Sequence, residues 1–98
     1  MKQIKEQQKR YLRGLGHKIK PVVLLGKSGF NDQVFEEIII ALNHHELIKV
    51  KINADSREER KRISSEIINR SQALLIHSIG NVILIYKNNP DNTRITLP

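Results

Sequence analysis

The sequence predicts a single α/β domain in which helices pack on a four-stranded mixed sheet. Helical and strand patterns alternate along the chain in the order α-β-α-β-α-β-β. A helix between two strands is typical of a crossover that joins parallel neighbours, and the last two strands are typical of a hairpin. A length of 98 residues suits one domain with one core. We therefore expect residues 1–98 to form one unit, with residues 89–98 as a loose tail.

The first helix is expected over residues 3–15. Its apolar side chains recur on one side at about 100° per residue, and basic side chains form an adjoining stripe. The apolar set is Ile4, Tyr11, Leu12 and Leu15, and the stripe is Lys2, Lys5, Lys9 and Arg13. The apolar side can dock on a sheet, and the helix should end near Gly14 and Gly16. A basic amphipathic helix can also lie on an anionic membrane, but this one lacks Trp and Phe, so we expect no membrane partner.

An apolar run over residues 21–25 predicts a buried strand, and the next helix is expected over residues 32–44 with Asn31 as its N-cap. Its apolar face consists of Val34, Phe35, Ile38, Ala41 and Leu42. Ile40 falls on the polar side of this helix, and the pattern does not explain it. The triplet His44-His45-Glu46 lacks metal-site spacing, because the HExxH template needs histidine where the chain has Lys49. We interpret the triplet as a surface helix end.

Residues 47–52 alternate between apolar and basic side chains. This alternation predicts a strand with one apolar face and one face that bears Lys49 and Lys51. A capping box from Ser56 to Glu59 opens the third helix. The basic residues of that helix either pair with its own glutamates or join a basic surface, and the sequence leaves both interpretations open.

The last two strands are predicted over residues 73–76 and 81–87, joined by a turn that contains Gly80. The chain has no cysteine, which excludes a disulfide framework and thiolate chemistry. No apolar run approaches the ~20 residues of a membrane span. The basic N-terminus also lacks the apolar core of a signal peptide. Together these features predict a cytoplasmic protein.

Charge is the most informative feature of the composition. Residues 1–30 carry eight basic side chains against Glu6 alone, whereas residues 31–98 carry nine of each sign. The whole formal net charge of +7 therefore lies in the first third of the chain. Such asymmetry favours a polyanionic partner. A basic helix that only keeps the protein in solution is the alternative.

The loop Gly26-Lys27-Ser28-Gly29 joins the first strand to the second helix. Its glycines allow a sharp turn and close approach of a ligand, and its lysine, its hydroxyl and the nearby helix N-terminus favour phosphate. The loop matches the end of G-x-x-x-x-G-K-[ST], but Pro21 stands where the leading glycine is needed, so we exclude an NTPase. The short form G-x-x-G clamps nucleic-acid backbones in KH domains. A plain strand-to-helix turn remains the alternative.

Catalysis has little support in the sequence. The candidate groups are His17, His77 and Ser28 with scattered carboxylates, and they show no Ser-His-Asp order or metal-binding acidic pair. We therefore expect no enzyme activity, no cofactor and no small-molecule substrate. The sequence assigns no role to His77. Aromatic residues are few, which favours recognition of a nucleic-acid backbone over stacking on bases.

Three segments, taken together, resemble one family. They are H-K-I-K-P-V-V at residues 17–23, L-G-K-S-G-F at residues 25–30 and H-E-L-I-K-V-K at residues 45–51. The joint pattern resembles the CRM domain, the chloroplast RNA splicing and ribosome maturation module. Its stand-alone bacterial members are the YhbY-like proteins. The resemblance covers residues 3–88 and is far more specific than the GKSG loop alone.

The resemblance implies a fold like the C-terminal domain of translation initiation factor three, with RNA as the partner. It implies contact with the RNA backbone and association with ribosomal RNA in precursors of the large ribosomal subunit. The residues alone indicate a polyanion-binding domain. The expected RNA-binding residues are Gly26, Lys27, Ser28, Gly29, His17, Lys18, Lys20, Lys5, Lys9, Arg13, Lys49 and Lys51. The alternative is a protein–protein adaptor on the ribosome that uses the Ile40 side.

Overall fold

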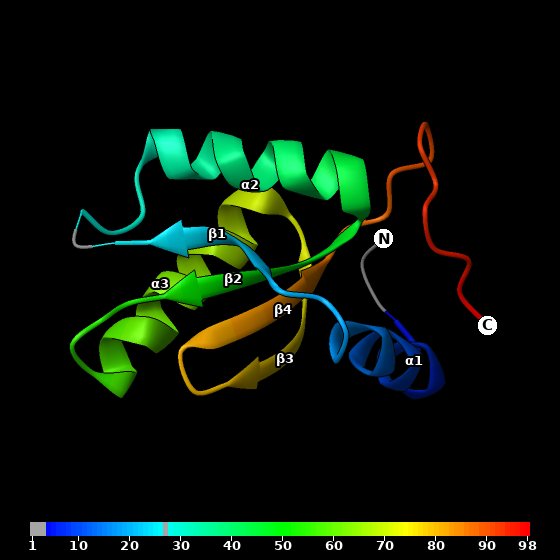
Figure 1. The fold of residues 1–98 in the computed structure, drawn as a ribbon, viewed down its shortest axis with the longest axis horizontal. Coiled ribbons are helices and arrows are strands. Elements are labelled where there is room, and N and C mark those ends of the chain that lie inside the picture. Colours follow the sequence, from blue (N-terminus) through cyan, green and yellow to red (C-terminus); the bar gives the residue numbers. More distant parts are fainter. Residues whose placement is uncertain (1–3, 27) are drawn as a thin grey trace.

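The computed structural model describes residues 4–26 and 28–98, and it contains the predicted order of helices and strands (Figure 1). The elements are α1 (Glu6–Gly16), β1 (Pro21–Leu25), α2 (Asp32–His45), β2 (Leu47–Ile52), α3 (Arg57–Ser71), β3 (Leu74–Ile79) and β4 (Val82–Tyr86). The first helix begins later than expected and ends at the second of its two glycines. The α/β class with four strands and three helices is confirmed.

The four strands form one mixed sheet in the spatial order β1-β2-β4-β3. β1 and β2 run parallel, with Leu25 level with Ile52, and α2 is the crossover between them. β4 runs antiparallel to both β2 and β3. The crossover through α3 therefore joins two parallel strands that β4 separates. The expectation that both crossovers connect neighbouring strands is wrong for this second one.

α2 and α3 cover one face of the sheet and build the larger part of the core (Figure 1). Ile48, Val50 and Ile52 point to this face from β2, as the alternation along that strand predicted. The same buried cluster contains Val23, Leu25, Ile38, Leu42, Ile63, Ile67, Ala73, Ile83 and Ile85. Because β1 alternates in the same way, Val22 and Leu24 point to the opposite face of the sheet.

Both long helices begin at the predicted caps. The Asn31 side chain accepts a hydrogen bond from the Val34 N–H at 2.9 Å. The Ser56 hydroxyl accepts one from the Glu59 N–H at 3.1 Å. Each cap satisfies a backbone donor that the first turn of a helix leaves without a partner.

α1 packs on the opposite face, at the end of the sheet where β2 begins (Figure 1). Leu12 is fully buried there, in a second cluster with Leu47, Ile76, Leu84 and Tyr86. Tyr11 was expected on this apolar side, but it is 43 % exposed. Among the described residues, no helix combines the length and the apolar character that crossing a membrane requires.

The segment after β4 contains no helix or strand, yet it is not the loose tail expected over residues 89–98. Ile95 and Leu97 pack on the cluster that α1 forms with the sheet. The Gln8 side chain donates a hydrogen bond to the carbonyl oxygen of Pro98 at 3.2 Å. The segment is therefore part of the packed structure, on the same face as α1.

Glu46 holds this segment in place. Its carboxylate accepts backbone N–H groups from Asn89 at 2.6 Å, Arg94 at 2.7 Å and Ile95 at 2.9 Å. Glu46 is fully buried. Its backbone φ is 63°, a value that residues other than glycine rarely adopt. The interpretation of residues 44–46 as a surface helix end is thus wrong for Glu46, because its carboxylate points into the protein.

α1 covers only part of its face of the sheet. The uncovered part carries three exposed apolar side chains, Val22 (54 %), Leu24 (62 %) and Ile79 (62 %). Lys49 and Lys51 point to the same face from β2, because Val50 and Ile52 point to the other. We refer to this uncovered part as the open sheet face.

Candidate nucleic-acid interface

Basic side chains recur at every fourth residue of α1 and its caps. They are Lys5, Lys9, Arg13 and His17. Residues four apart lie above one another on a helix, so these four share one side of α1. Lys5 is the N-cap of the helix and His17 its C-cap. The stripe therefore runs the full length of α1, and at its carboxyl end it reaches the open sheet face.

A cleft of about 230 Å³ lies where the stripe meets the sheet. Arg13 and His17 line it from α1, Lys49 lines it from β2 and His77 from β3. Burial lowers the pKa of His77 below its ordinary value, and the charges of Arg13, His17, Lys49 and Lys9 lower it further. The sequence pattern assigns His77 no role, because only the folding of β3 beside β4 brings it next to α1.

Lys49 and Lys51 extend the basic surface along β2. The strand register places Lys49 level with Pro21, at the start of β1, and Lys51 level with Leu24. A rise of about 3.3 Å per residue puts these two lysines roughly 7 Å apart along the strand. The set Lys5, Lys9, Arg13, His17, Lys49 and Lys51 therefore forms one path, which we name the basic track.

The GKSG loop lies at the other end of β1 from α1 (Figure 1). The Gly29 N–H donates to the Gly26 carbonyl oxygen at 3.1 Å, which closes a tight turn. Gly29 has a φ of 72°, a conformation that favours glycine, and Ser28 is exposed to solvent. Lys27, the expected phosphate ligand of the loop, lies outside the described residues. Lys51 is the member of the basic track nearest to this loop in the strand register.

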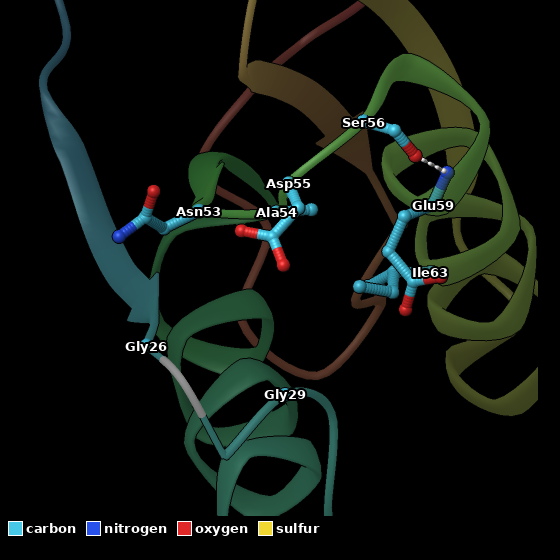
Figure 2. Close-up of a pocket in the computed structure, with 8 residues that line it drawn as sticks. All are labelled: Gly26, Gly29, Asn53, Ala54, Asp55, Ser56, Glu59 and Ile63. Carbon is cyan, nitrogen blue, oxygen red and sulfur yellow. Dashed lines mark hydrogen bonds between the residues drawn. The ribbon is translucent and has the colours of Figure 1, made fainter.

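A cavity of about 510 Å³ separates the loop from the start of α3 (Figure 2). Asp55 and Glu59 line it together with Gly26 and Gly29. The negative charge of Asp55 opposes binding of an anion in the cavity, whereas that of Glu59 is offset in part by Arg62. A phosphate on the GKSG loop would therefore lie on the side of the loop away from α3. These acidic neighbours could not be predicted from the sequence around the loop, because they follow a different strand.

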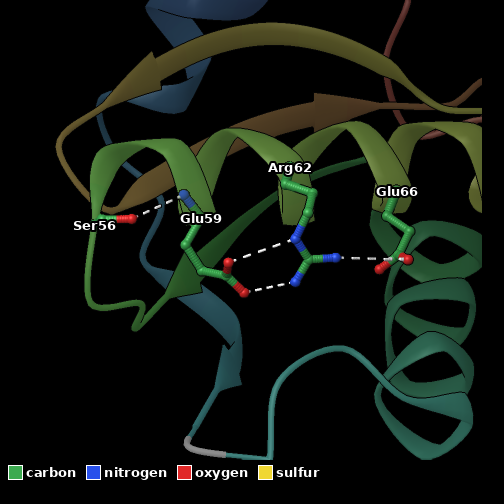
Figure 3. Close-up of polar contacts among 4 residues, drawn as sticks. All are labelled: Ser56, Glu59, Arg62 and Glu66. Atoms are coloured by element: carbon green, nitrogen blue, oxygen red, sulfur yellow. Dashed lines mark hydrogen bonds and ion pairs between the residues drawn. The ribbon is translucent and has the colours of Figure 1, made fainter.

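Not all basic residues of α3 are free to bind an anionic ligand, because one of them pairs with glutamates of the same helix. Arg62 lies 2.5 Å from the Glu59 carboxylate and 4.0 Å from that of Glu66 (Figure 3). The hydrogen bond between Glu59 and Arg62, with their opposite charges, lowers the pKa of Glu59 and raises that of Arg62. Arg62 therefore follows the interpretation of pairing within the helix. Arg57, Arg60 and Lys61 instead line a separate cavity on the α3 face of the sheet.

Arg70 connects α3 to the segment that follows the GKSG loop. Its guanidinium carbon lies 4.2 Å from the ring centroid of Phe35 and 5.5 Å from that of Phe30. One guanidinium nitrogen is 3.2 Å from the Asp32 carboxylate. Cation–π contacts of this kind stabilise the arrangement of the two rings. Phe35, expected in the core, is thus half-buried beside Arg70.

Lys18 and Lys20 lie apart from the GKSG loop. They border a different cavity of about 580 Å³, at the start of β1, together with Leu15 and Ile19. Five residues of strand, roughly 16 Å at about 3.3 Å per residue, separate this position from the loop. The two lysines therefore belong with α1 in space, and their closeness to the loop in sequence is not kept in the fold.

Comparison with known proteins agrees with the sequence pattern. The sequence model of the CRS1 / YhbY (CRM) domain matches residues 4–87. The chain belongs to the CRM domain family. It is 39 % identical over 98 residues to a Haemophilus influenzae protein named "RNA-binding protein", covering all of this chain and 98 % of that one. It is 36 % identical over 91 residues to "Probable RNA-binding protein YqeI" of Bacillus subtilis, covering 93 % of this chain and 95 % of that one.

The CRM fold of this chain also matches a solved structure. The solution structure of the Staphylococcus aureus protein SAV1595 superimposes with a TM-score of 0.83 at 33 % sequence identity. The match covers 98 % of this chain and all of the other. The whole basic track lies within the part of the chain that matches the CRM domain.

Proposed function

We propose that this CRM domain binds RNA by contacting its phosphate backbone along the basic track and the GKSG loop. The observation that carries the proposal is the track itself, which α1 and β2 build together although their lysines are far apart in sequence. The three ion pairs formed among the described residues all involve α2 or α3. The cations of the track are thus free of acidic partners within that part of the chain. The names of two relatives support RNA as the polyanion.

The chemistry of the track favours backbone contacts over base reading. Lysine, arginine and histidine donate hydrogen bonds to phosphate oxygens, which are the same at every nucleotide. Lys51 is exposed, and Lys49 is half-buried beside the apolar side chains of the open sheet face. We therefore infer that the domain binds structured or double-stranded RNA with little sequence preference.

The test is the salt dependence of RNA binding. Each phosphate contact contributes a slope of about −0.7 to −0.9 in log K against log salt concentration. The double variant Lys49→Gln, Lys51→Gln should therefore bind an RNA duplex more weakly and with a slope shallower by about 1.5. The control variant Arg57→Gln, Lys61→Gln removes the same charge from the opposite face of the sheet. Equal losses in both variants, or a flat salt response in the wild type, would contradict the proposal.

The GKSG loop is tested separately. Lys27→Ala should weaken binding of all RNAs alike and reduce the salt slope by about one contact. Gly29→Asp should do more harm, because it places a negative charge where phosphate is expected. Gly29→Ala controls for backbone strain at positive φ, and Gly26→Ala has neither that strain nor a neighbour within 4 Å. If Gly29→Asp loses affinity only in proportion to the folded protein lost, the loop is a plain turn.

We further propose that the RNA is ribosomal RNA in precursors of the large ribosomal subunit. Support for this step is the resemblance of residues 17–23, 25–30 and 45–51 to CRM domains that act in ribosome maturation. Crosslinking in cells followed by sequencing of the bound RNA tests it, and a set of crosslinks without ribosomal RNA would contradict it. An adaptor that uses Ile40, which is 58 % exposed, would instead keep its ribosomal contacts after RNase treatment.

A further inference from the structure

The cleft at the carboxyl end of α1 concentrates basic groups from three elements. Nine residues line it, and none of them is acidic. Arg13, His17, Lys49 and His77 supply its polar rim, while Val82 and Leu84 of β4 supply part of an apolar wall. Such a pocket repels cations and, with its low polarity, strengthens the attraction for an anion. We name it the His77 cleft.

The basic groups of the His77 cleft lack partners in the described part of the chain. None of the ion pairs formed there includes Arg13 or Lys49. The Nε atom of Arg13 is buried and has no hydrogen-bond partner among the described residues. A buried donor without an acceptor is costly, and it shows that no group of the described chain pairs with this guanidinium, so an anion at its outer nitrogens would displace no internal partner.

Resting on the proposed RNA-binding function, we propose that the His77 cleft binds one phosphate group of RNA and that His77 takes up a proton as it binds. The charged groups that face His77 are Lys9, Arg13 and His17 from α1 and Lys49 from β2. All of them are basic, so they disfavour the charged form of His77 while the cleft is empty. A phosphate adds the missing negative charge and reverses this preference.

Proton uptake couples RNA affinity to pH. Burial and the basic neighbours lower the pKa of His77 in the free protein, and a bound phosphate would raise it. Affinity should therefore increase as the pH falls through the interval between the free and the bound pKa, by at most about tenfold per pH unit for one proton. Above that interval the RNA binds without the proton and the pH dependence from this group disappears.

NMR titration of the histidine side chains measures the coupling directly. The chain has four histidines, and His77 is followed in the free protein, with inorganic phosphate and with an RNA duplex. Sodium chloride at matched ionic strength serves as the control for general screening. We expect phosphate and RNA to raise the pKa of His77, and chloride to leave it unchanged.

Two variants connect the titration to affinity. His77→Gln should lose the increase in RNA affinity that the wild type shows between pH 8 and pH 6. His44→Gln, an exposed residue at the end of α2, should keep that increase. Thermal melts confirm that both variants are folded. His77→Lys places a permanent charge in the cleft and should raise affinity at pH 8.

The outcomes separate this inference from the proposed function. If RNA binds while the pKa of His77 stays unchanged, or if His77→Gln keeps the full pH dependence, the His77 cleft is not a phosphate site. If phosphate raises that pKa but RNA does not bind at any pH, the cleft is an anion site and the proposed RNA-binding function is wrong.

Discussion

Replacing Glu46, the C-cap of α2, with glutamine should destabilise the protein more than any single change of a polar side chain within α2. The glutamate accepts three backbone N–H groups from the C-terminal segment and is fully buried. Glutamine keeps one carbonyl oxygen, so it can still accept hydrogen bonds from the N–H groups of Arg94 and Ile95. Its amide nitrogen would then face the Asn89 N–H, where two donors oppose each other.

The magnitude follows from these three contacts. An unpaired buried donor costs about 1–3 kcal/mol, and loss of the charge weakens each remaining bond by about 1 kcal/mol. The sum is roughly 3–5 kcal/mol, a large part of the 5–15 kcal/mol that stabilises a typical domain. At about 4–8 °C per kcal/mol, the melting temperature should fall by roughly 12–40 °C.

Thermal melts and amide hydrogen exchange form the assay. The control is Glu37→Gln, which removes the same charge from an exposed position of α2. The N–H groups of Asn89, Arg94 and Ile95 should exchange much faster in Glu46→Gln than in the control. Glu46→Gly should melt above Glu46→Ala, because glycine accepts the φ of 63° without strain.

Two results would refute this reasoning. In the first, Glu46→Gln melts within about 2 °C of Glu37→Gln, well below the scale expected for a lost buried partner. In the second, the three amides remain as protected as in the wild type. Either result would mean that the C-terminal segment is held without the carboxylate, by Ile95, Leu97 and the hydrogen bonds to Asn43 and His44.

Four further substitutions test the packing and the titration of the domain. Gly16→Ala should destabilise it by about 1–3 kcal/mol, because the new Cβ would lie 2.5 Å from a methyl carbon of Leu84. Gly14→Ala, with no neighbour within 4 Å, should stabilise it by about 0.5–1 kcal/mol. Gln72→Gly should raise the melting temperature by a few degrees, because Gln72 ends α3 with a φ of 61°. Without RNA, the free energy of unfolding should fall as the pH drops below about 6.5. The reason is that the pKa of His77 is lowered in the folded protein, so the unfolded chain binds a proton at this residue more readily. His77→Gln should reduce that loss, as urea denaturation at several pH values can measure.

Local signals allowed much of the fold to be predicted. Asn31 and Ser56 cap the helices that follow them, because a cap depends on residues only two or three positions away. The alternation around Lys49 gave the orientation of β2, since side chains of a strand point to its two faces in turn. The alternating order of helices and strands likewise predicted the α/β fold class.

Contacts between distant segments could not be predicted in this way. Glu46 is buried because its acceptor oxygens meet N–H groups 43 to 49 positions later in the chain. Arg70 pairs with Asp32 across 38 positions, which placed Phe35 against a guanidinium and not in the core. No periodic pattern in a single segment contains such pairings.

In the candidate site, too, local groupings could be predicted and contacts between distant segments could not. Helical spacing alone grouped Lys5, Lys9 and Arg13, and strand alternation grouped Lys49 with Lys51. Only the sheet order showed that the two groups meet, and that His77 lies where they do. The sequence left open whether Lys18 and Lys20 lie near the GKSG loop in space, and the fold separates them from it by a whole strand.

The contact between Gln8 and Pro98 has a consequence for the connectivity of the fold. These two residues are 90 positions apart, yet the segments that contain them pack into one cluster against the same sheet face. A short linker could therefore join position 98 to position 4, and the chain could be cut open in the turn between β3 and β4 instead. All strand pairings and both apolar clusters would be retained in such a circular permutant. The arrangement of the sheet thus depends on which segments touch, and much less on where the polypeptide is interrupted.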